Sequence, residues 1–500
     1  PGLIDCSLLM PPRQGPDKRL RYTMLRTLRA FAMAHMADAG EEDETIAALA
    51  AFALAVAEEA GPGLEAGAGE LDAVCWLDAE DATLSRGLAW LLDHDQAGAL
   101  RLAAALAPWW RLRGRMAEAY GYLSTALSHT TGRLTAGPAP VLARAQVWLG
   151  HVSANSGDPV GSLDCYVAAA SACGNPSREL VDALMGQTAI RLNLGDVAGA
   201  ARDAGDALKQ SRELGYAAGE VQALTGLSLT AFYTGDAMEA VARARQARAS
   251  LQGRISGYVA RWCHMALAHV LLETGDIDTA RHMCAAGIAL SRQVGDLADL
   301  TNLLNIKVNI ERLAGDADAA GAALLEAVAI STRTGDRIGL LNCVDEGAYL
   351  CVMTERWAEA ATLWAALETD RRRLGLPSES VFHGRRNEYE ERIEQALAPA
   401  EVREARARGA RLALATAVEL VTMLAATAGE SAGTGRGTLL SSRERELVTL
   451  VGQGHTNAEI AARLSISVRT VSSHLDRIRA KTGYRRRADL TRLALNEGLI

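Results

Sequence analysis

The residues best suited to contacting another molecule lie in the stretch Leu440–Lys481, where basic and hydroxyl side chains recur at helical spacing. Three hydroxyl residues there could cap helices, two of them with a glutamate three positions later: Ser441 with Glu444, Thr456 with Glu459, and Ser467. In such capping boxes the hydroxyl and the carboxylate satisfy free amides at a helix start. Arginines and hydroxyls exposed on short capped helices are suited to DNA phosphates and base edges.

The apolar residues of this stretch fall into three groups with helical periodicity. They are Leu447, Leu450 and Val451, then Ile460, Ala461 and Leu464, and then Val471, Leu475 and Ile478. Only Ser465, Ile466 and Ser467 separate the second group from the third. Two short amphipathic helices joined by so tight a turn predict a helix-turn-helix whose second helix reads DNA.

The charge of the C-terminal region agrees with a nucleic-acid partner. Residues 439–500 hold 11 Arg and Lys against 6 Asp and Glu, a net charge of +5, whereas the whole chain carries −8. Because phosphate neutralisation supplies much of the affinity for DNA, a basic terminal module on an acidic body favours a DNA-binding protein. Pattern and charge alone leave open that these are only solvated surface helices.

The segment from Leu440 to about Ile500 closely resembles the LuxR-type helix-turn-helix of bacterial transcription regulators. The matching residues are RERE at Arg443–Glu446, Gly454, TNAEIAARL at Thr456–Leu464, SVRTV at Ser467–Val471, His474, Lys481 and RADLTRLAL from Arg487. The resemblance implies that the N-terminal half of the third helix enters the major groove of promoter DNA.

The same resemblance assigns roles to individual residues. It places three side chains over base edges: Ser472, Ser473 and Asp476. It places five on or near phosphates: Arg469, Thr470, Arg477, Arg479 and Lys481. It implies scaffold roles for Glu444, Val471 and His474, and a dimer contact for a fourth helix over Arg487–Glu497. Family members often carry a basic residue where Ser472 and Asp476 stand; an aspartate there is repelled by phosphate but could accept from a cytosine amino group.

Length and composition predict several all-α domains. The chain has 500 residues, 49% of them hydrophobic but only 4% aromatic, which favours close packing of helices rich in alanine and leucine. Neither a membrane-spanning run nor a signal peptide is evident, so we expect a cytoplasmic protein. None of the four lysines follows a glycine, which excludes a Walker A loop within these residues. We expect no enzyme activity from this chain.

The sequence indicates neither a metal site nor a cofactor. The eight cysteines are scattered without a CxxC pair, as reduced structural thiols are. The nearest approach to a metal cluster has the spacing of no common zinc site: Cys263, His264, His269, His282 and Cys284. We therefore interpret these five residues as helix-packing residues.

Glycines mark a repeat in the middle of the chain. Gly-Asp occurs at Gly157, Gly195, Gly235, Gly275 and Gly315, at steps of 38 or 40 residues, and a second glycine series interleaves with it. Two helix stops per period of about 40 residues predict a two-helix repeat, with about seven pairs between Ala97 and Gly375. This resembles the tetratricopeptide class in its longer form, and stacking of such units predicts a solenoid with a concave groove.

Polar residues on the first helices are our candidates for contacts in that groove. They are Asn193, Tyr233, His264, His269, Asn302, Asn305, Asn309 and Asn342. The four asparagines from Asn302 to Asn342 are the selected ligand residues, because asparagine inside a helix costs propensity and needs a reason. Hydrogen bonding between neighbouring repeats would explain them equally well.

The predicted organisation has five parts. Residues 1–96 are a winged-helix remnant and helical connector, 97–376 the repeat array, 377–428 its C-terminal helices, 429–438 a flexible linker and 439–500 the DNA-binding domain. In residues 1–96 we expect strands at Leu8–Met10 and Tyr22–Leu25, followed by helices at Leu25–Ala39 and Glu42–Ala60. In residues 377–428 we expect one helix over Val402–Thr427. Three segments resemble the region after the nucleotide-binding module in large regulators of the signal-transducing ATPase class: Arg21–Glu41, Trp76–Asp93 and Ala107–Gly114. Since Pro1 is not a start methionine, we expect that module to be absent here.

The predicted function is a transcription regulator whose array receives a signal and whose C-terminal module binds a promoter. The expected partners are double-stranded DNA, a second copy of the chain in a dimer or larger oligomer, and a small-molecule, peptide or protein ligand; RNA polymerase is a further candidate. Two alternatives stay open. One is a repeat scaffold whose terminal module binds protein, and the other is the C-terminal portion of an ATP-dependent switch.

Overall fold

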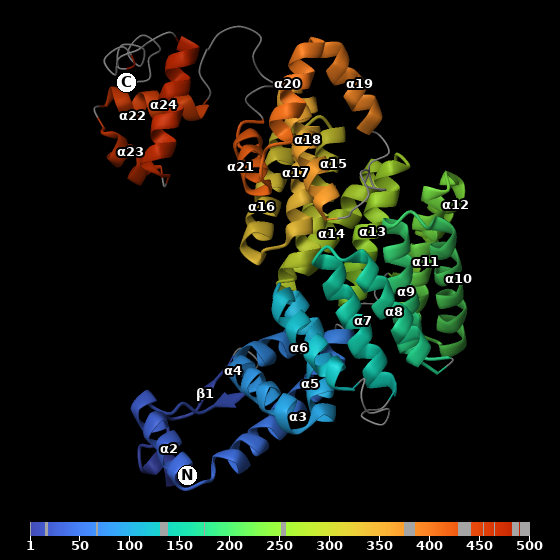
Figure 1. Ribbon diagram of the computed structural model, residues 1–500, viewed down its shortest axis with the longest axis vertical. Helices are drawn as coiled ribbons and strands as arrows, with labels where there is room; N and C mark the ends of the chain where they lie inside the picture. Colours follow the sequence, from blue (N-terminus) through green and yellow to red (C-terminus); the bar gives the residue numbers. More distant parts are fainter. Residues whose placement is uncertain are drawn as a thin grey trace.

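The computed structural model describes the chain apart from residues 1, 16–18, 67–68, 131–138, 175, 252–256, 375–385, 429–441, 454, 465, 483–489 and 491–500. The side chains of residues 65–66, 129–130, 442–443, 477 and 480–482 also lie outside the described part. Within the described ranges the chain forms 24 helices and a single two-stranded hairpin (Figure 1). The prediction of an all-α solenoid with a C-terminal helix-turn-helix is confirmed.

The repeat array consists of seven antiparallel helix pairs, as the glycine spacing predicts. The pairs are α5 (Gln96–Leu112) with α6 (Met116–Thr130), α7 (Ala139–Asn155) with α8 (Pro159–Ala172), α9 (Arg178–Asn193) with α10 (Val197–Leu214), α11 (Ala217–Tyr233) with α12 (Ala237–Leu251), α13 (Tyr258–Glu273) with α14 (Ile277–Val294), α15 (Leu297–Leu313) with α16 (Ala317–Thr334), and α17 (Arg337–Met353) with α18 (Trp357–Arg373). Within each pair the two helices pack on each other.

Each Gly-Asp dipeptide ends one helix and starts the next. Gly275 adopts a left-handed backbone with φ of 90°, which a residue without a Cβ tolerates best. Asp276 then caps α14, because its carboxylate accepts from the amide of Thr279 at 3.2 Å. The other four dipeptides repeat this geometry. The spacing of the Gly-Asp dipeptides in the sequence therefore marks where one helix ends and the next begins.

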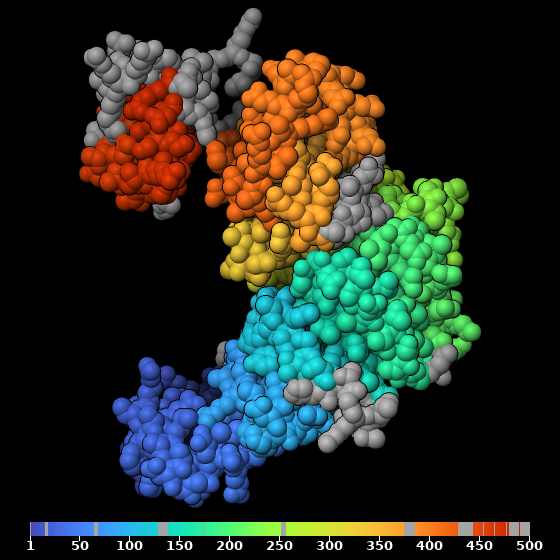
Figure 2. Space-filling view, viewed as in Figure 1, coloured from blue at the N-terminus to red at the C-terminus, as the bar shows by residue number. Residues whose placement is uncertain are grey.

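The array winds into a superhelix that returns on itself. Helices α4 (Glu70–His94) and α5 contact α14 and α15, which lie about 200 residues further along the chain (Figure 1). A continuous core of buried alanine, leucine and cysteine side chains extends from α9 to the C-terminal helices. Figure 2 shows the N-terminal helices in blue and the C-terminal helices of the array in orange at opposite ends of this body.

The N-terminal region has the predicted helices but a shifted hairpin. Helices α1 (Gly2–Asp5), α2 (Arg26–Asp38) and α3 (Glu42–Ala66) precede α4, and α3 packs against α4. The strands are β1 (Arg13–Gln14) and β2 (Leu20–Arg21), so the prediction of strands at Leu8–Met10 and Tyr22–Leu25 is wrong. The observed pairing lies between the two predicted strands, and the neighbouring Arg19 stacks over Trp76, 3.3 Å from its ring centre, and pairs with Glu59.

Three helices close the C-terminal end of the array. They are α19 (Arg386–Ala396), α20 (Pro399–Gly409) and α21 (Leu414–Ala425). Helix α20 packs on α18, and α21 packs on α16 and α17. The single predicted helix over Val402–Thr427 is wrong, because the chain turns after Gly409. A Cβ at Gly409 would lie 2.0 Å from the carbonyl oxygen of Thr362, so α20 ends in close contact with α18.

Helix α3 is, by length and composition, apolar enough to cross a membrane. The segment Glu42–Leu64 has a mean hydropathy of 1.3. Its side chains Ala50, Ala53 and Val56 are nevertheless buried in one cluster with Leu84 of α4. This side of α3 therefore packs into the core, although only 33% of the apolar window is buried.

Candidate DNA-binding and ligand-binding sites

The first helices of the pairs enclose a cavity on the inner side of the superhelix, which we call the lumen. Its volume is about 910 Å³, at the upper end of the range usual for ligand pockets. Residues of α5, α7, α9, α11, α13, α15 and α17 line it, together with α19 and the end of α18. Because each first helix contributes one strip of the wall, positions one repeat apart lie at matching places in the lumen.

Most of the predicted groove residues line the lumen. Those that do are Asn193, His269, Asn302, Asn305, Asn309 and Asn342. Tyr233 and His264 do not border the cavity, although both lie on first helices. His264 instead bonds through Nδ1 to the carbonyl of Ala260 at 2.7 Å, and burial lowers the pKa of its imidazole.

Two of the four selected asparagines hold neighbouring repeats together. Asn309 donates from Nδ2 to Oε1 of Glu346 at 2.6 Å, which joins α15 to α17. Asn305 accepts through Oδ1 a weak hydrogen bond from the thiol of Cys343 at 3.7 Å. Hydrogen bonding between repeats, the alternative left open by the sequence, therefore accounts for Asn309 and for the Oδ1 of Asn305, whereas Nδ2 of Asn305 has no partner among the described residues.

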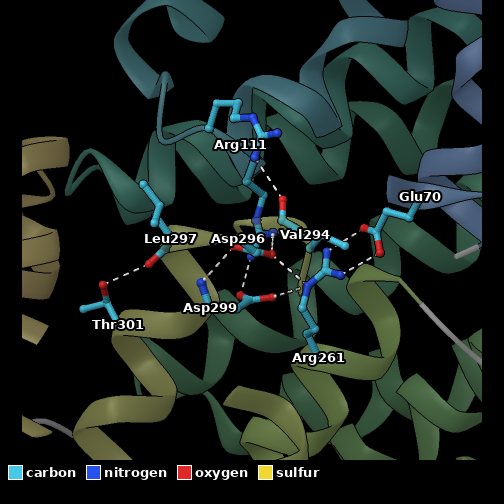
Figure 3. Close-up of polar contacts among 9 residues, drawn as sticks. Glu70, Arg111, Arg261, Val294, Asp296, Leu297, Asp299 and Thr301 are labelled. Carbon is cyan, nitrogen blue, oxygen red and sulfur yellow. Dashed lines mark hydrogen bonds and ion pairs between the residues drawn. The ribbon is translucent and has the colours of Figure 1, made fainter. Parts of the chain in front are cut away.

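A buried network of five charged side chains lies where the superhelix returns on itself (Figure 3). Arg111 donates to Asp296 at 3.0 Å and forms a short contact with Asp299. Arg261 donates to Asp296 at 2.9 Å, and both of its terminal nitrogens reach Glu70 at 2.8 Å. All five side chains are at least nine-tenths buried, and Arg111 and Asp299 also border the lumen.

The network contains three carboxyl groups against two guanidinium groups. Burial raises the pKa of Asp299 to about 7, and the neighbouring Asp296 carboxylate adds to this rise. Burial acts in the same direction on Asp296, but Arg111 and Arg261 more than offset it and lower the pKa of that carboxyl. A proton on Asp299 therefore removes the excess negative charge near neutral pH.

The C-terminal domain is built from the three predicted helices: α22 (Ser442–Gly452), α23 (Asn457–Arg463) and α24 (Val468–Thr482). Their apolar faces form one small core, as the periodicity predicts. Its buried members are Leu447, Val448, Leu450, Val451, Ile460, Ala461, Val471, Leu475, Ile478 and Leu490. Leu464 packs against this core from its edge, and Glu444 is buried too, consistent with a scaffold role.

Hydroxyl caps fix the starts of the second and third helices. The side chain of Thr456 accepts from the amide of Glu459 at 3.3 Å, while the Glu459 carboxylate accepts from the Thr456 amide at 2.7 Å. These bonds lower the pKa of Glu459. Ser467 accepts from the amide of Thr470 at 3.0 Å. The capping box predicted at Ser441 lies outside the described residues.

The first turns of α24 present a polar surface. Arg469, Thr470, Ser473 and Asp476 are exposed, whereas Ser472 and Arg479 are half-buried. Asp476 is paired within its own helix, where Nη1 of Arg479 donates to its Oδ1 at 2.6 Å. The side chains of Arg477 and Lys481, and the predicted fourth helix apart from Leu490, lie outside the described residues, as do the linker residues 429–438.

The helices, caps and core of this domain agree with a known protein family. Residues 438–494 match the family model GerE, described as bacterial regulatory proteins of the luxR family. These residues form a LuxR-type helix-turn-helix domain.

Two curated relatives match short stretches of the chain. Response regulator Rre1 of Synechocystis sp. is 47% identical over 57 residues, which are 11% of this chain and 25% of the relative. Oxygen regulatory protein NreC of Staphylococcus aureus is 39% identical over 62 residues, 12% of this chain and 29% of the relative. The chain thus spans between a quarter and a third of the length of these relatives.

Two solved structures align with the helical body. The crystal structure of a Rap protein complexed with competence and sporulation factor has a TM-score of 0.44 at 13% identity, covering 71% of this chain and all of that chain. A structure of pilF of Pseudomonas aeruginosa has a TM-score of 0.30 at 15% identity, covering 49% of this chain and 96% of that chain.

Several residues at both sites were not among the sequence predictions. In the LuxR-type domain, Asn457 donates to the hydroxyl of Ser472 at 3.4 Å and so couples α23 to α24. In the lumen, Arg111 and Asp299 pair across a sequence separation of 188 residues, for which no local signal exists. Gln222 could have been found, since it lies 80 residues before Asn302 and therefore at the same place in its repeat.

Proposed function

We propose that this chain is a DNA-binding transcription regulator in which the repeat array controls a C-terminal LuxR-type domain. The observation that carries the proposal is the family match over residues 438–494. It is supported by the exposed polar first turns of α24, the helix that enters the major groove in helix-turn-helix proteins. Arg469 and Thr470 would contact phosphates there, and Ser473 and Asp476 would face base edges. For Arg477 and Lys481 the phosphate role rests on the sequence resemblance alone.

Regulation would come from the array. The lumen offers a large concave wall of apolar, aromatic and polar side chains, which suits a ligand-sensing role. Since one recognition helix contacts few base pairs, two copies of the chain on paired half-sites would supply the specificity that promoter recognition needs. Such a regulator would act in the cytoplasm, beside RNA polymerase.

The salt dependence of DNA binding tests this function. Fluorescence anisotropy of a labelled random-sequence duplex, titrated with the full chain between 50 and 200 mM salt, measures how many phosphates are neutralised. We expect log affinity to fall steeply and linearly with log salt concentration. A slope near zero would favour a protein-binding scaffold instead.

A further inference from the structure

Four aromatic side chains on the wall of the lumen are only half-buried. Trp148 and His151 lie in α7, and Tyr258 and Trp262 lie one turn apart in α13. Elsewhere the chain buries an aromatic ring almost completely, as for Trp364 of α18, which is 2% exposed. Core packing therefore does not account for the whole surface of the four side chains, since part of it borders the cavity. We call Trp148, His151, Tyr258 and Trp262 the aromatic corner.

Three rings of the aromatic corner contact one another at steep angles. The ring centre of Trp148 lies 5.1 Å from that of His151 and 6.3 Å from that of Tyr258, and the centres of His151 and Tyr258 are 5.7 Å apart. The planes of these pairs meet at 47°, 56° and 77°. Because the rings are not parallel, they present faces and edges in different directions. A planar ring can stack on one of them while meeting the edge of another.

The charges beside the aromatic corner cancel. The guanidinium of Arg111 lies 4.4 Å from the ring centre of Tyr258 and links the corner to the buried charge network. That network carries no net charge once Asp299 holds its proton. Burial and the charge of Arg111 lower the pKa of His151 to about 3, so its imidazole is neutral near pH 7. A charged ligand would therefore lose hydration at this corner without gaining a partner of opposite sign.

The exposed parts of these rings favour a flat apolar ligand. In a lumen filled with water, such a ligand gains free energy by covering apolar ring surface. A planar aromatic ring adds offset-stacked or edge-to-face contacts, which a puckered saturated ring cannot make. The lumen volume of about 910 Å³ leaves room for a compound of several rings.

We propose that the aromatic corner binds an uncharged, planar aromatic compound, which stacks on the rings of Trp148, Tyr258 and Trp262. This inference rests on the proposed function in taking the lumen as the sensory site of the regulator. Because Arg111 contacts both Tyr258 and Asp296, the ligand would lie next to the contacts that close the superhelix.

Equilibrium dialysis of the full chain against matched two-ring compounds at pH 7 tests this proposal without DNA. The probe is naphthol, and its saturated counterpart is decahydronaphthol, which keeps the carbon skeleton and the hydroxyl but has neither a planar ring nor π electrons. We expect naphthol to bind at least about tenfold more tightly, although the saturated alcohol is no less apolar. The naphthoate anion and protonated naphthylmethylamine should also bind at least about tenfold more weakly than naphthol.

Substitutions in the aromatic corner locate the binding. Trp148→Leu and Trp262→Leu should each weaken naphthol binding about fivefold, whereas Trp148→Phe, which restores a ring, should stay within about twofold of the parent. Trp357→Leu in α18 is the matched control, because Trp357 is half-buried but does not border the lumen, and it should leave binding unchanged. Circular dichroism of each variant confirms that the helices persist before affinities are compared.

Four outcomes would each overturn the proposal. They are equal binding of naphthol and decahydronaphthol, tighter binding of either charged probe, parental affinity in both leucine variants, and no binding of naphthol at millimolar concentration. A loss of helix in Trp148→Leu alone leaves the decision to Trp262→Leu and Trp148→Phe.

The outcome is separable from the proposed function. Naphthol binding by a chain that fails to bind DNA would remove the regulator and leave the aromatic site. DNA binding by a chain that binds no naphthol would remove the aromatic site and leave the regulator.

Discussion

Arg261 donates hydrogen bonds from both terminal nitrogens to the carboxylate of Glu70, each at 2.8 Å and across 191 positions of sequence. Glu70 is the first residue of α4 and Arg261 lies in α13, so the pair fastens the N-terminal helices to the middle of the array. This charge pair favours closure of the superhelix, since without Arg261 the Glu70 carboxylate would be buried with no cation beside it.

Replacing Arg261 by methionine should destabilise the array strongly. The change leaves Glu70 without a buried cation and Asp296 with Arg111 alone, which costs about 3–5 kcal/mol and should lower the midpoint of urea unfolding followed by circular dichroism. Arg243→Met removes a matched but exposed pair with Glu239, which is 2.7 Å long, and should cost well under about 1 kcal/mol. Equal shifts in the two variants would show that the network does not stabilise the closed superhelix.

The same network should make stability depend on pH through Asp299. Its folded pKa, about 7, lies above the ordinary value of 3.8, so the folded state holds a proton that the unfolded state has released. The stabilisation associated with that proton is present below about pH 4, is lost as pH rises towards 7, and changes no further above that.

Asp299→Asn isolates this effect, because asparagine resembles the protonated acid and does not titrate. Relative to the parent chain, the variant should gain stability as pH is raised from 5 to 8, as measured by thermal melting at each pH. Glu346, whose pKa burial raises to about 8, contributes with the same sign in both proteins and cancels in the comparison. A pH-independent difference between the two melting temperatures would show that Asp299 is ionised throughout.

Two charge changes on α24 should affect DNA binding differently. Arg469→Ala should weaken binding to every sequence and reduce the salt slope by about 1, since it removes one phosphate contact. Arg403→Ala, an exposed arginine of α20, is the matched control and should change neither.

Asp476→Ala removes a carboxylate that Arg479 holds at 2.6 Å. It should release Arg479 towards the DNA, strengthen binding to all sequences, and relax the base preference at one position of the site. Competition binding with single-base variants of a preferred site measures both effects. Uniformly weaker binding without a change in preference would argue against a base-facing position for Asp476.

Much of this architecture could be predicted from sequence because its signals are local. Gly275 and Asp276, like their counterparts, mark helix ends by backbone conformation and capping, which depend on a few adjacent residues. The apolar periodicity around Leu447, Ile460 and Val471 likewise predicts the core of the LuxR-type domain.

What the sequence could not provide depends on contacts between distant residues. The sequence around Arg111 does not indicate that Asp299 is its partner, nor the reverse. The two residues come together only where the superhelix returns on itself. The hairpin was also misplaced, since strands of two residues each are too short to show an alternating pattern. The asparagines could be selected from sequence, but only the structure separates Asn305 and Asn309, which join repeats, from Asn302 and Asn342.

Sequence selection by the full chain tests the central claim most directly. The protein is incubated with a library of random-sequence duplexes, bound DNA is recovered and amplified over several rounds, and the enriched pool is sequenced. We predict enrichment of one motif with two related half-sites, as a dimer of LuxR-type domains would select. Recovery of DNA with no shared sequence after repeated rounds would contradict the assignment of this chain as a transcription regulator.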